Sequence, residues 1–291
     1  MLKHRLMSGF LIATTMYLIA AHAPPVGAWV LIIMISTLGQ LEFYAMAEKA
    51  DFPVFRVYGT LCGAALISAT FCTIGPDPES IASCYKWENV VLLMTLIVIF
   101  VRQFFQKKNE RALATIACTL LGVWYVPFLF NYFTRLAFAW DGADSGTGVP
   151  RTGQLLVLYL VVVVKMADVG AYFVGRAIGK HKLFYRITPG KTWEGLFGGV
   201  VASIVASWVF FRVSGGDLGK LHMELVDAMV LGVAMPIVGV VGDMFESLVK
   251  RACSIKDSSE TIPGMGGVLD VVDSLLFGAP VLYVYACAFL V

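Results

Sequence analysis

Nine stretches of this chain are long and apolar enough to cross a lipid bilayer, and they limit the fold more than any other feature. A membrane-spanning helix needs about 20 mostly apolar residues. Hydrophobic residues make up 58% of the chain and charged residues only 14%, against roughly 25% charged in soluble domains. The sequence therefore predicts an all-α fold, a polytopic membrane helical bundle with spans near residues 5–22, 26–47, 54–74, 88–105, 112–134, 154–175, 194–213, 225–249 and 273–291.

The connections between these stretches are short, so we expect one integral membrane domain over residues 1–291. Residues 1–153 would form a scaffold and residues 154–291 would carry the chemistry. The net charge of +2 is too small to indicate a nucleic-acid partner. The six cysteines are scattered without a CxxC pair, and the four histidines are far apart. Neither a zinc site, a disulfide framework nor a serine–histidine hydrolase is indicated.

The distribution of basic residues predicts the orientation in the membrane. Lysines and arginines in short connections favour the cytoplasmic side. If the N-terminus and every second connection share one side, that side holds 16 of the 22 lysines and arginines, the other holds 5, and Lys165 lies within a stretch. This bias predicts a cytoplasmic N-terminus and an outer C-terminus. The connections after the sixth and eighth stretches would then face the cytoplasm.

The first five stretches offer little chemistry. Glu42 is the only acidic residue well inside them, and beside Phe43 near the end of a stretch we interpret it as an interfacial residue. The short connection from Pro76 to Glu88 has mixed charge, and we expect no function there. The Gly- and Asp-rich stretch 139–153 predicts an exposed outer loop.

The sixth stretch contains two charges, Lys165 and Asp168. Charged residues within a membrane span are costly and are therefore functional candidates. Three residues apart on a helix, they can pair with each other. Such a pair could lock helix packing or serve a site; for Asp168 we favour the site, because the helix carries it toward the basic connection that begins with Arg176.

That basic connection ends in Pro189-Gly190-Lys191-Thr192. It brings a lysine and a hydroxyl to the start of a helix, where unpaired backbone N–H groups favour phosphate. The alternative is that its cations only set the orientation of the protein and bind anionic headgroups. In the following stretch, small residues recur every four positions and predict a close-packing helix face: Gly195, Gly199, Ser203 and Ser207.

The densest polar pattern lies between the last two stretches. One helical face carries Asp243, Glu246, Ser247 and Lys250, at i, i+3, i+4 and i+7. Such groups must face protein or water, because lipid would leave them unsatisfied. A glycine-rich turn follows, and then Asp270 and Asp273 at the start of the last helix. Carboxylates beside cations and glycines predict a site for magnesium and phosphates, although a polar loop between two spans is the simpler alternative.

The same residues resemble the signature of the bacterial CDP-diacylglycerol synthases, also called phosphatidate cytidylyltransferases. The matching motifs are Gly242-Asp243-x-x-Glu246-Ser247-x-x-Lys250-Arg251, Lys256-Asp257-Ser258-Ser259, Ile262-Pro263-Gly264, Gly266-Gly267 and Leu269-Asp270-x-x-Asp273. Ala167-Asp168, Gly175-Arg176, Gly179-Lys180-His181-Lys182-Leu183 and Pro189-Gly190-Lys191-Thr192-Trp193-Glu194-Gly195 are also similar to that family. The resemblance covers the C-terminal part of the chain and is specific.

The resemblance implies an enzyme that joins CTP and phosphatidic acid to give CDP-diacylglycerol and pyrophosphate. It would lie in the bacterial inner membrane with a cytoplasm-facing active site, and would use Mg2+, with two ions expected and a monovalent cation and a homodimer left open. The catalytic residues would be Asp243, Lys250, Arg251, Asp270 and Asp273, and the three aspartates would hold the metal. The substrates would be bound by Asp168, Arg176, Lys191, Thr192, Ser247, Lys256, Asp257, Gly266 and Gly267.

Two positions depart from the family pattern. Met265 stands where histidine is usual, and Val271 stands where arginine is usual. A slower enzyme, a relative that uses CTP on another lipid, and an inactive relative therefore stay open. A transporter or channel that uses Lys165 and Asp168 is the alternative from another class. Transporters commonly contain internal repeats, and we find none here.

Overall fold

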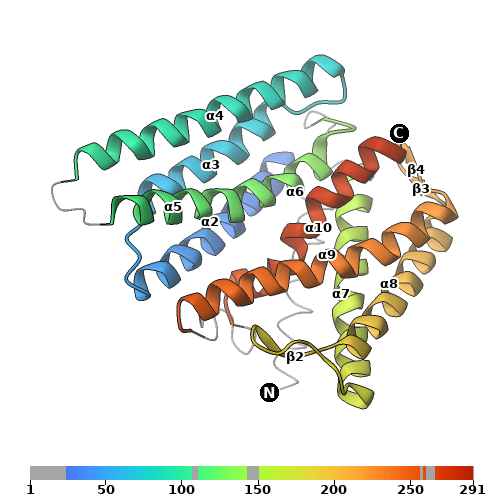
Figure 1. The fold of residues 1–291 in the computed structure, drawn as a ribbon. Coiled ribbons are helices and arrows are strands. Elements are labelled where there is room, and N and C mark those ends of the chain that lie inside the picture. Colours follow the sequence, from blue (N-terminus) through green and yellow to red (C-terminus); the bar gives the residue numbers. More distant parts are fainter. Residues whose placement is uncertain (1–23, 107–110, 143–150, 256–257, 260–265, 291) are drawn as a thin grey trace. The chain divides into compact units, whose positions relative to one another are not determined.

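The computed structural model describes residues 24–106, 111–142, 151–255, 258–259 and 266–290, and these residues form long helices and two short hairpins (Figure 1). Seven helices are long and apolar enough to cross a membrane: Pro25–Lys49 (α2), Pro78–Phe104 (α4), Ala112–Phe138 (α5, η1 and α6), Arg151–Ile178 (α7), Trp193–Ser214 (α8), Leu225–Ala252 (α9) and Val268–Phe289 (α10). The protein is thus an all-helical membrane protein with multiple spans. Helix α3 (Arg56–Thr73) has 18 residues and is not among the seven. The predicted stretch 5–22 lies outside the described residues, so the count of nine stays a prediction.

Helix α4 begins ten residues earlier than the sequence pattern predicted, and the interpretation of Pro76–Glu88 as a connection is wrong. Asp77 caps the helix, since its carboxylate accepts a hydrogen bond of 2.8 Å from the Ser80 backbone N–H. Pro78 occupies the first turn, where its missing N–H costs nothing. Glu88 therefore lies inside a helix, and its side chain is buried.

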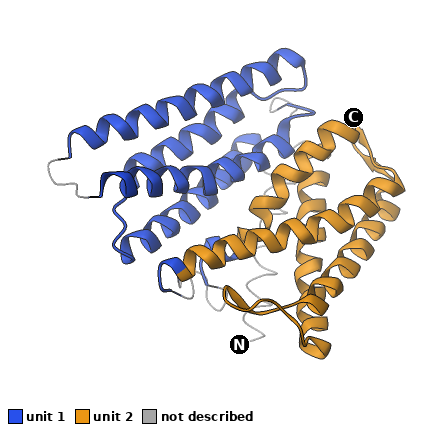
Figure 2. Ribbon diagram, viewed as in Figure 1, with its two compact units in different colours: residues 1–150, 252–271 blue, residues 151–251, 272–291 orange. Residues whose placement is uncertain are grey.

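The chain divides into two compact units (Figure 2). Unit 1 comprises residues 1–150 and 252–271. Polar contacts join three of its helices: Gln40 Nε2 on α2 donates to the Gly59 carbonyl on α3 at 3.0 Å, and the Tyr44 hydroxyl donates to the Thr119 carbonyl on α5 (Ala112–Val123) at 2.9 Å. A π-helical turn, η1 (Trp124–Phe128), contains Pro127 and leads into α6 (Leu129–Phe138). These contacts fix the rotation of α2 within unit 1.

Unit 2 comprises residues 151–251 and 272–291. It contains α7, the antiparallel hairpin of β1 (Lys182–Phe184) and β2 (Thr188–Thr192), α8, the short hairpin of β3 (Asp217–Leu218) and β4 (Leu221–His222), α9 and most of α10. The predicted close-packing face of α8 is confirmed. Gly195, Gly199, Ser203 and Ser207 are all buried.

The glycines of α8 have no side chain, and this lets α8 lie directly against α7. A Cβ atom on Gly199 would lie 2.9 Å from the Ala167 carbonyl oxygen. Further along α8, the Ser207 hydroxyl donates to the Ala228 carbonyl of α9 at 2.6 Å. Helix α9 in turn meets α10, where the Tyr285 hydroxyl donates to Asp227 at 2.8 Å. Unit 2 is therefore a continuous packing of four helices.

Candidate active site

A cavity of about 440 Å³ opens in unit 2 between α7, α8, α9 and strand β2. Its walls are built largely of small residues, among them Gly175, Gly195 and Gly239. Five of the predicted site residues line it: Asp168, Arg176, Lys191, Thr192 and Asp243. Residues 75 positions apart in the sequence are thus brought to one concave, mostly apolar site, the arrangement typical of a small-molecule pocket.

Strand β2 delivers Lys191 to the cavity. Lys191 Nζ forms an ion pair with Asp243 on α9, and the two side chains are 30% and 20% exposed. The neighbouring Thr192 is buried and caps α8, since its hydroxyl oxygen accepts a hydrogen bond of 3.1 Å from the Gly195 N–H. The strand therefore leads directly into the helix, and the lysine is held at the N-terminal end of α8.

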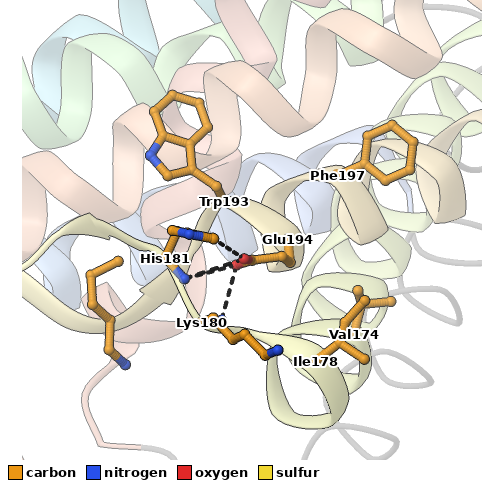
Figure 3. Close-up of a pocket in the computed structure, with 8 residues that line it drawn as sticks. Val174, Ile178, Lys180, His181, Trp193, Glu194 and Phe197 are labelled. Atoms are coloured by element: carbon orange, nitrogen blue, oxygen red, sulfur yellow. Dashed lines mark hydrogen bonds and ion pairs between the residues drawn. The ribbon is translucent and has the colours of Figure 1, made fainter.

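The hairpin is held in place by Glu194 (Figure 3). Its carboxylate accepts hydrogen bonds of 3.2 Å from the backbone N–H groups of Lys180 and His181, and it contacts His181 Nδ1 at 2.6 Å. The same residues line an open groove of about 820 Å³, where Trp193 and Phe197 are 57% and 71% exposed. Glu194 thus fixes both ends of the segment that carries Lys191.

The two charges inside α7 pair as predicted. Lys165 Nζ lies 3.3 Å from Asp168 Oδ2, and it also donates to the Ser274 hydroxyl of α10 at 3.1 Å. Asp168 lines the cavity and lies within electrostatic reach of Lys191 and Asp243. The pair therefore belongs to the same charged group as the Lys191–Asp243 ion pair.

Helices α9 and α10 bring two more predicted residues together. Asp273 is 8% exposed and lies within electrostatic reach of Asp243. The helices approach closely because Gly242 has no side chain; a Cβ there would lie 2.5 Å from the Asp273 carbonyl oxygen. Glu246, one turn beyond Asp243, accepts a hydrogen bond of 2.8 Å from Lys250. The half-buried Lys250 is thereby held beside the carboxylates.

Asp243 and Asp273 have the oxygen donors that magnesium prefers. Among the residues that the structure describes, no three His, Cys, Asp or Glu side chains are grouped so that they could hold a metal ion. Two carboxylates nevertheless fit magnesium, which usually binds through one or two carboxylates and completes its shell with water and substrate phosphate. Asp243 and Asp273 are the residues that would hold it.

The third predicted metal ligand, Asp270, lies in unit 1 at the start of α10. Its Oδ2 accepts hydrogen bonds from the Ser258 hydroxyl at 2.6 Å, the Ser258 N–H at 3.1 Å and the Gly267 N–H at 2.8 Å. Its bond to Gly267, three residues earlier, is that of a helix-capping carboxylate. Whether Asp270 also holds metal stays a prediction.

Comparison with known proteins relates the chain to one family. The model of the cytidylyltransferase family matches residues 3–289. The chain belongs to the cytidylyltransferase family. The resemblance read from the motifs is thereby confirmed.

Relatives in this family carry a more specific name. The phosphatidate cytidylyltransferase of Haemophilus influenzae is 44% identical over 131 residues, 45% of each chain. That of Bacillus subtilis is 32% identical over 194 residues, which are 67% of this chain and 64% of the relative. That of Synechocystis sp. is 29% identical over 276 residues, 87% of this chain and 86% of the relative. The chain thus spans less than two thirds of the length of the first two relatives.

The other predicted site residues are placed as follows. Ser247 is half-buried on α9, whereas Arg176 and Arg251 are exposed near the ends of α7 and α9. Arg176 donates to the Tyr172 hydroxyl at 2.8 Å. Gly266 has a φ of +95°, which favours glycine. Lys256, Asp257 and the unusual Met265 lie outside the described residues, and Val271 is half-buried on α10.

The interpretation of Glu42 as an interfacial residue is wrong. Glu42 is 8% exposed, and its carboxylate accepts hydrogen bonds from the Ser259 hydroxyl and from the backbone N–H groups of Val268 and Leu269. Sequence reasoning missed it because its partners are more than 200 residues away. The one available signal was a carboxylate well inside an apolar stretch, which lipid would not tolerate.

Proposed function

We propose that this protein transfers the cytidylyl group of CTP to phosphatidate, and so makes CDP-diacylglycerol and pyrophosphate in the membrane. Membership of the cytidylyltransferase family supports the reaction class, and the names of the relatives suggest the lipid. The observation that carries the proposal is the ion pair of Lys191 and Asp243 at a cavity between helices of unit 2, with Asp273 within electrostatic reach of Asp243.

The reaction needs little from a general base. A phosphate oxygen of phosphatidate is already ionised and forms a bond to the α-phosphorus of CTP, while the bond between the α-phosphorus and the bridging oxygen breaks. Pyrophosphate leaves with that electron pair. Such transfers depend mainly on positioning and on compensation of charge. Magnesium, when bound, supplies compensation for the phosphate charges.

The acidic and basic residues have different roles in this reaction. Asp243 and Asp273 would hold magnesium, and Lys191 would exchange Asp243 for a substrate phosphate, since each of its N–H groups makes a strong charge-assisted bond to phosphate oxygen. Until substrate binds, the Lys191–Asp243 pair compensates both charges in a largely apolar cavity. Lys165 holds Asp168 in the same way. Lys250, held by Glu246, keeps a further cation beside the carboxylates.

The orientation and membrane also belong to this proposal. The distribution of basic residues supports a cytoplasmic N-terminus and a cavity on the cytoplasmic side, where CTP is available. Two magnesium ions, nine spans and a homodimer are the remaining expectations. The transporter alternative was based on Lys165 and Asp168. It is less well supported, because these two residues pair with each other and Asp168 lines the same cavity as the other site residues.

The proposal is tested with the purified protein in lipid vesicles. Pyrophosphate release should require CTP, phosphatidate and magnesium together, and replacing phosphatidate by diacylglycerol should stop it. Pyrophosphate release with another anionic lipid alone would assign a different acceptor. Solute flux without any pyrophosphate release would instead support the transporter.

A further inference from the structure

Glu42 connects helix α2 to the first turn of α10, and both α2 and that turn belong to unit 1. Its Oε1 accepts from the Ser259 hydroxyl at 2.6 Å and from the Val268 N–H at 3.0 Å, and its Oε2 accepts from the Leu269 N–H at 2.9 Å. The first N–H groups of a helix have no partner within the helix. Glu42 therefore caps α10 from another helix and places negative charge at its positive end.

Packing around Glu42 leaves the first turn of α10 little freedom. Leu269 is fully buried, and its side chain lies 3.9 Å from the position that a Cβ on Gly39 would occupy, one turn before Glu42 on α2. At Gly267, a Cβ would lie 2.5 Å from Glu42 Oε2. Glu42 thus occupies the space that a side chain at residue 267 would need. This contact explains why glycine is required at residue 267.

The same turn carries Asp270. Its carboxylate accepts hydrogen bonds from Gly267, which lies against Glu42, and from Ser258, whose neighbour Ser259 donates to Glu42. Helix α2 is itself fixed, because Gln40 and Tyr44, on either side of Glu42, bond to α3 and α5. A chain of direct contacts therefore runs from the fixed rotation of α2 through Glu42 to the orientation of Asp270.

We propose that Glu42 is a positioning residue of the active site: it anchors the first turn of α10 and so sets the orientation of Asp270, one of the predicted metal ligands. The role in catalysis rests on the proposed function, whereas the anchoring does not. Glu42 itself touches neither substrate nor metal in this account. Residues that orient metal ligands typically change metal affinity or activity by about 10- to 100-fold when replaced.

The test compares Glu42→Gln with Glu48→Gln. Both residues lie on α2, but the Glu48 side chain is 45% exposed and pairs with Arg56 across 3.8 Å, so its variant is a matched control. Hydrogen exchange in metal-free detergent solution should be about tenfold faster at the Val268 and Leu269 amides of the Glu42 variant, because each loses a bond to a charged acceptor. The control should exchange like the wild type. Unchanged exchange in Glu42→Gln would overturn the anchoring.

Kinetics test the consequence for the site. The magnesium concentration for half-maximal activity should rise about tenfold in Glu42→Gln, a shift that a mere loss of folded protein would not cause. An unchanged magnesium midpoint would overturn the positioning role. If the wild type lacks activity, the proposed function fails, while the exchange experiment still decides the anchoring. Should Glu42→Gln not fold, Ser259→Ala removes one of the three bonds and should show a smaller shift in the same direction.

Discussion

Both units contain charged pairs among apolar helices, but the pairs differ in their surroundings. In unit 1, Glu88 and Arg135 have side chains only 6% and 5% exposed. Glu88 also accepts hydrogen bonds from Thr70 at 2.6 Å and Asn131 at 2.8 Å, while the Arg135 guanidinium lies 4.3 Å from the ring centre of Tyr85. In unit 2, the Lys191–Asp243 pair faces a cavity and is 30% and 20% exposed.

This difference in surroundings distinguishes an ion pair that stabilises the fold from one that can bind a ligand. A buried pair whose charged groups are enclosed by protein offers nothing to a ligand, and breaking it leaves one charge uncompensated in an apolar interior. A pair at a cavity can exchange its partners for a metal and a phosphate when they arrive. We therefore propose that Glu88–Arg135 serves stability and that Lys191–Asp243 serves catalysis. The variants below test that assignment.

The largest effect is expected at Asp243. Asp243→Asn keeps the shape of the side chain but removes a charged oxygen from the proposed metal site. Cytidylyltransferase activity should fall by about a thousandfold or more, as for loss of a principal electrostatic group. The melting temperature should stay near that of the wild type. Near-normal turnover in this variant would remove Asp243 from the site.

The opposite result, a loss of stability without a loss of activity, is expected for the Glu88–Arg135 pair in unit 1. Arg135→Met leaves Glu88 buried without its partner and should lower the free energy of unfolding by roughly 3–5 kcal/mol. The activity of the molecules that remain folded should not change. The double variant Glu88→Leu with Arg135→Leu should regain most of the stability, because it leaves no lone charge. Reduced kcat in a stable double variant would show that the pair serves catalysis.

An intermediate effect is expected at Lys191. Lys191→Ala should raise the KM for CTP or phosphatidate by about 10- to 100-fold, since a hydrogen bond to a charged group contributes about 1.5–3 kcal/mol. Lys182→Ala on the same hairpin is the control, because Lys182 lines the open groove and not the cavity. Equal effects of the two variants would mean that the hairpin acts only through its overall charge.

The smallest effect is expected at Thr192. Thr192→Ala removes the cap of α8 and should lower the free energy of unfolding by about 1 kcal/mol. Thr192→Ser keeps the hydroxyl that accepts from Gly195 and should retain most of that stability. Thermal unfolding of both variants measures the difference. If Thr192→Ala changes KM more than it changes stability, the hydroxyl binds substrate as the sequence predicted.

Sequence reasoning succeeded where the signal is local. The long apolar stretches correspond to long helices, the spacing of Lys165 and Asp168 gave their pairing, and the four-residue period of small residues gave the packing face of α8. Each of these patterns repeats within one or two helical turns. The helix period alone determines which residues meet.

It failed where the partner is distant in the sequence. Glu88 meets Arg135 across 47 residues, and Glu42 meets Leu269 across 227 residues. No periodicity links such positions, so Glu42 was interpreted as interfacial and Glu88 as part of a connection. The β1–β2 hairpin was also missed, because β2 includes a proline and a glycine, which are rare in strands.

The most direct test of the central claim follows the two ends of CTP. Purified protein in phosphatidate vesicles with magnesium should move label from the α-phosphorus of CTP into extracted lipid, while label from the γ-phosphorus should stay in water as pyrophosphate. A folded Asp273→Asn variant should abolish both the transfer of α-label to lipid and the release of γ-label as pyrophosphate. Label from the γ-phosphorus in the lipid, or unchanged α-label transfer by Asp273→Asn, would contradict the account.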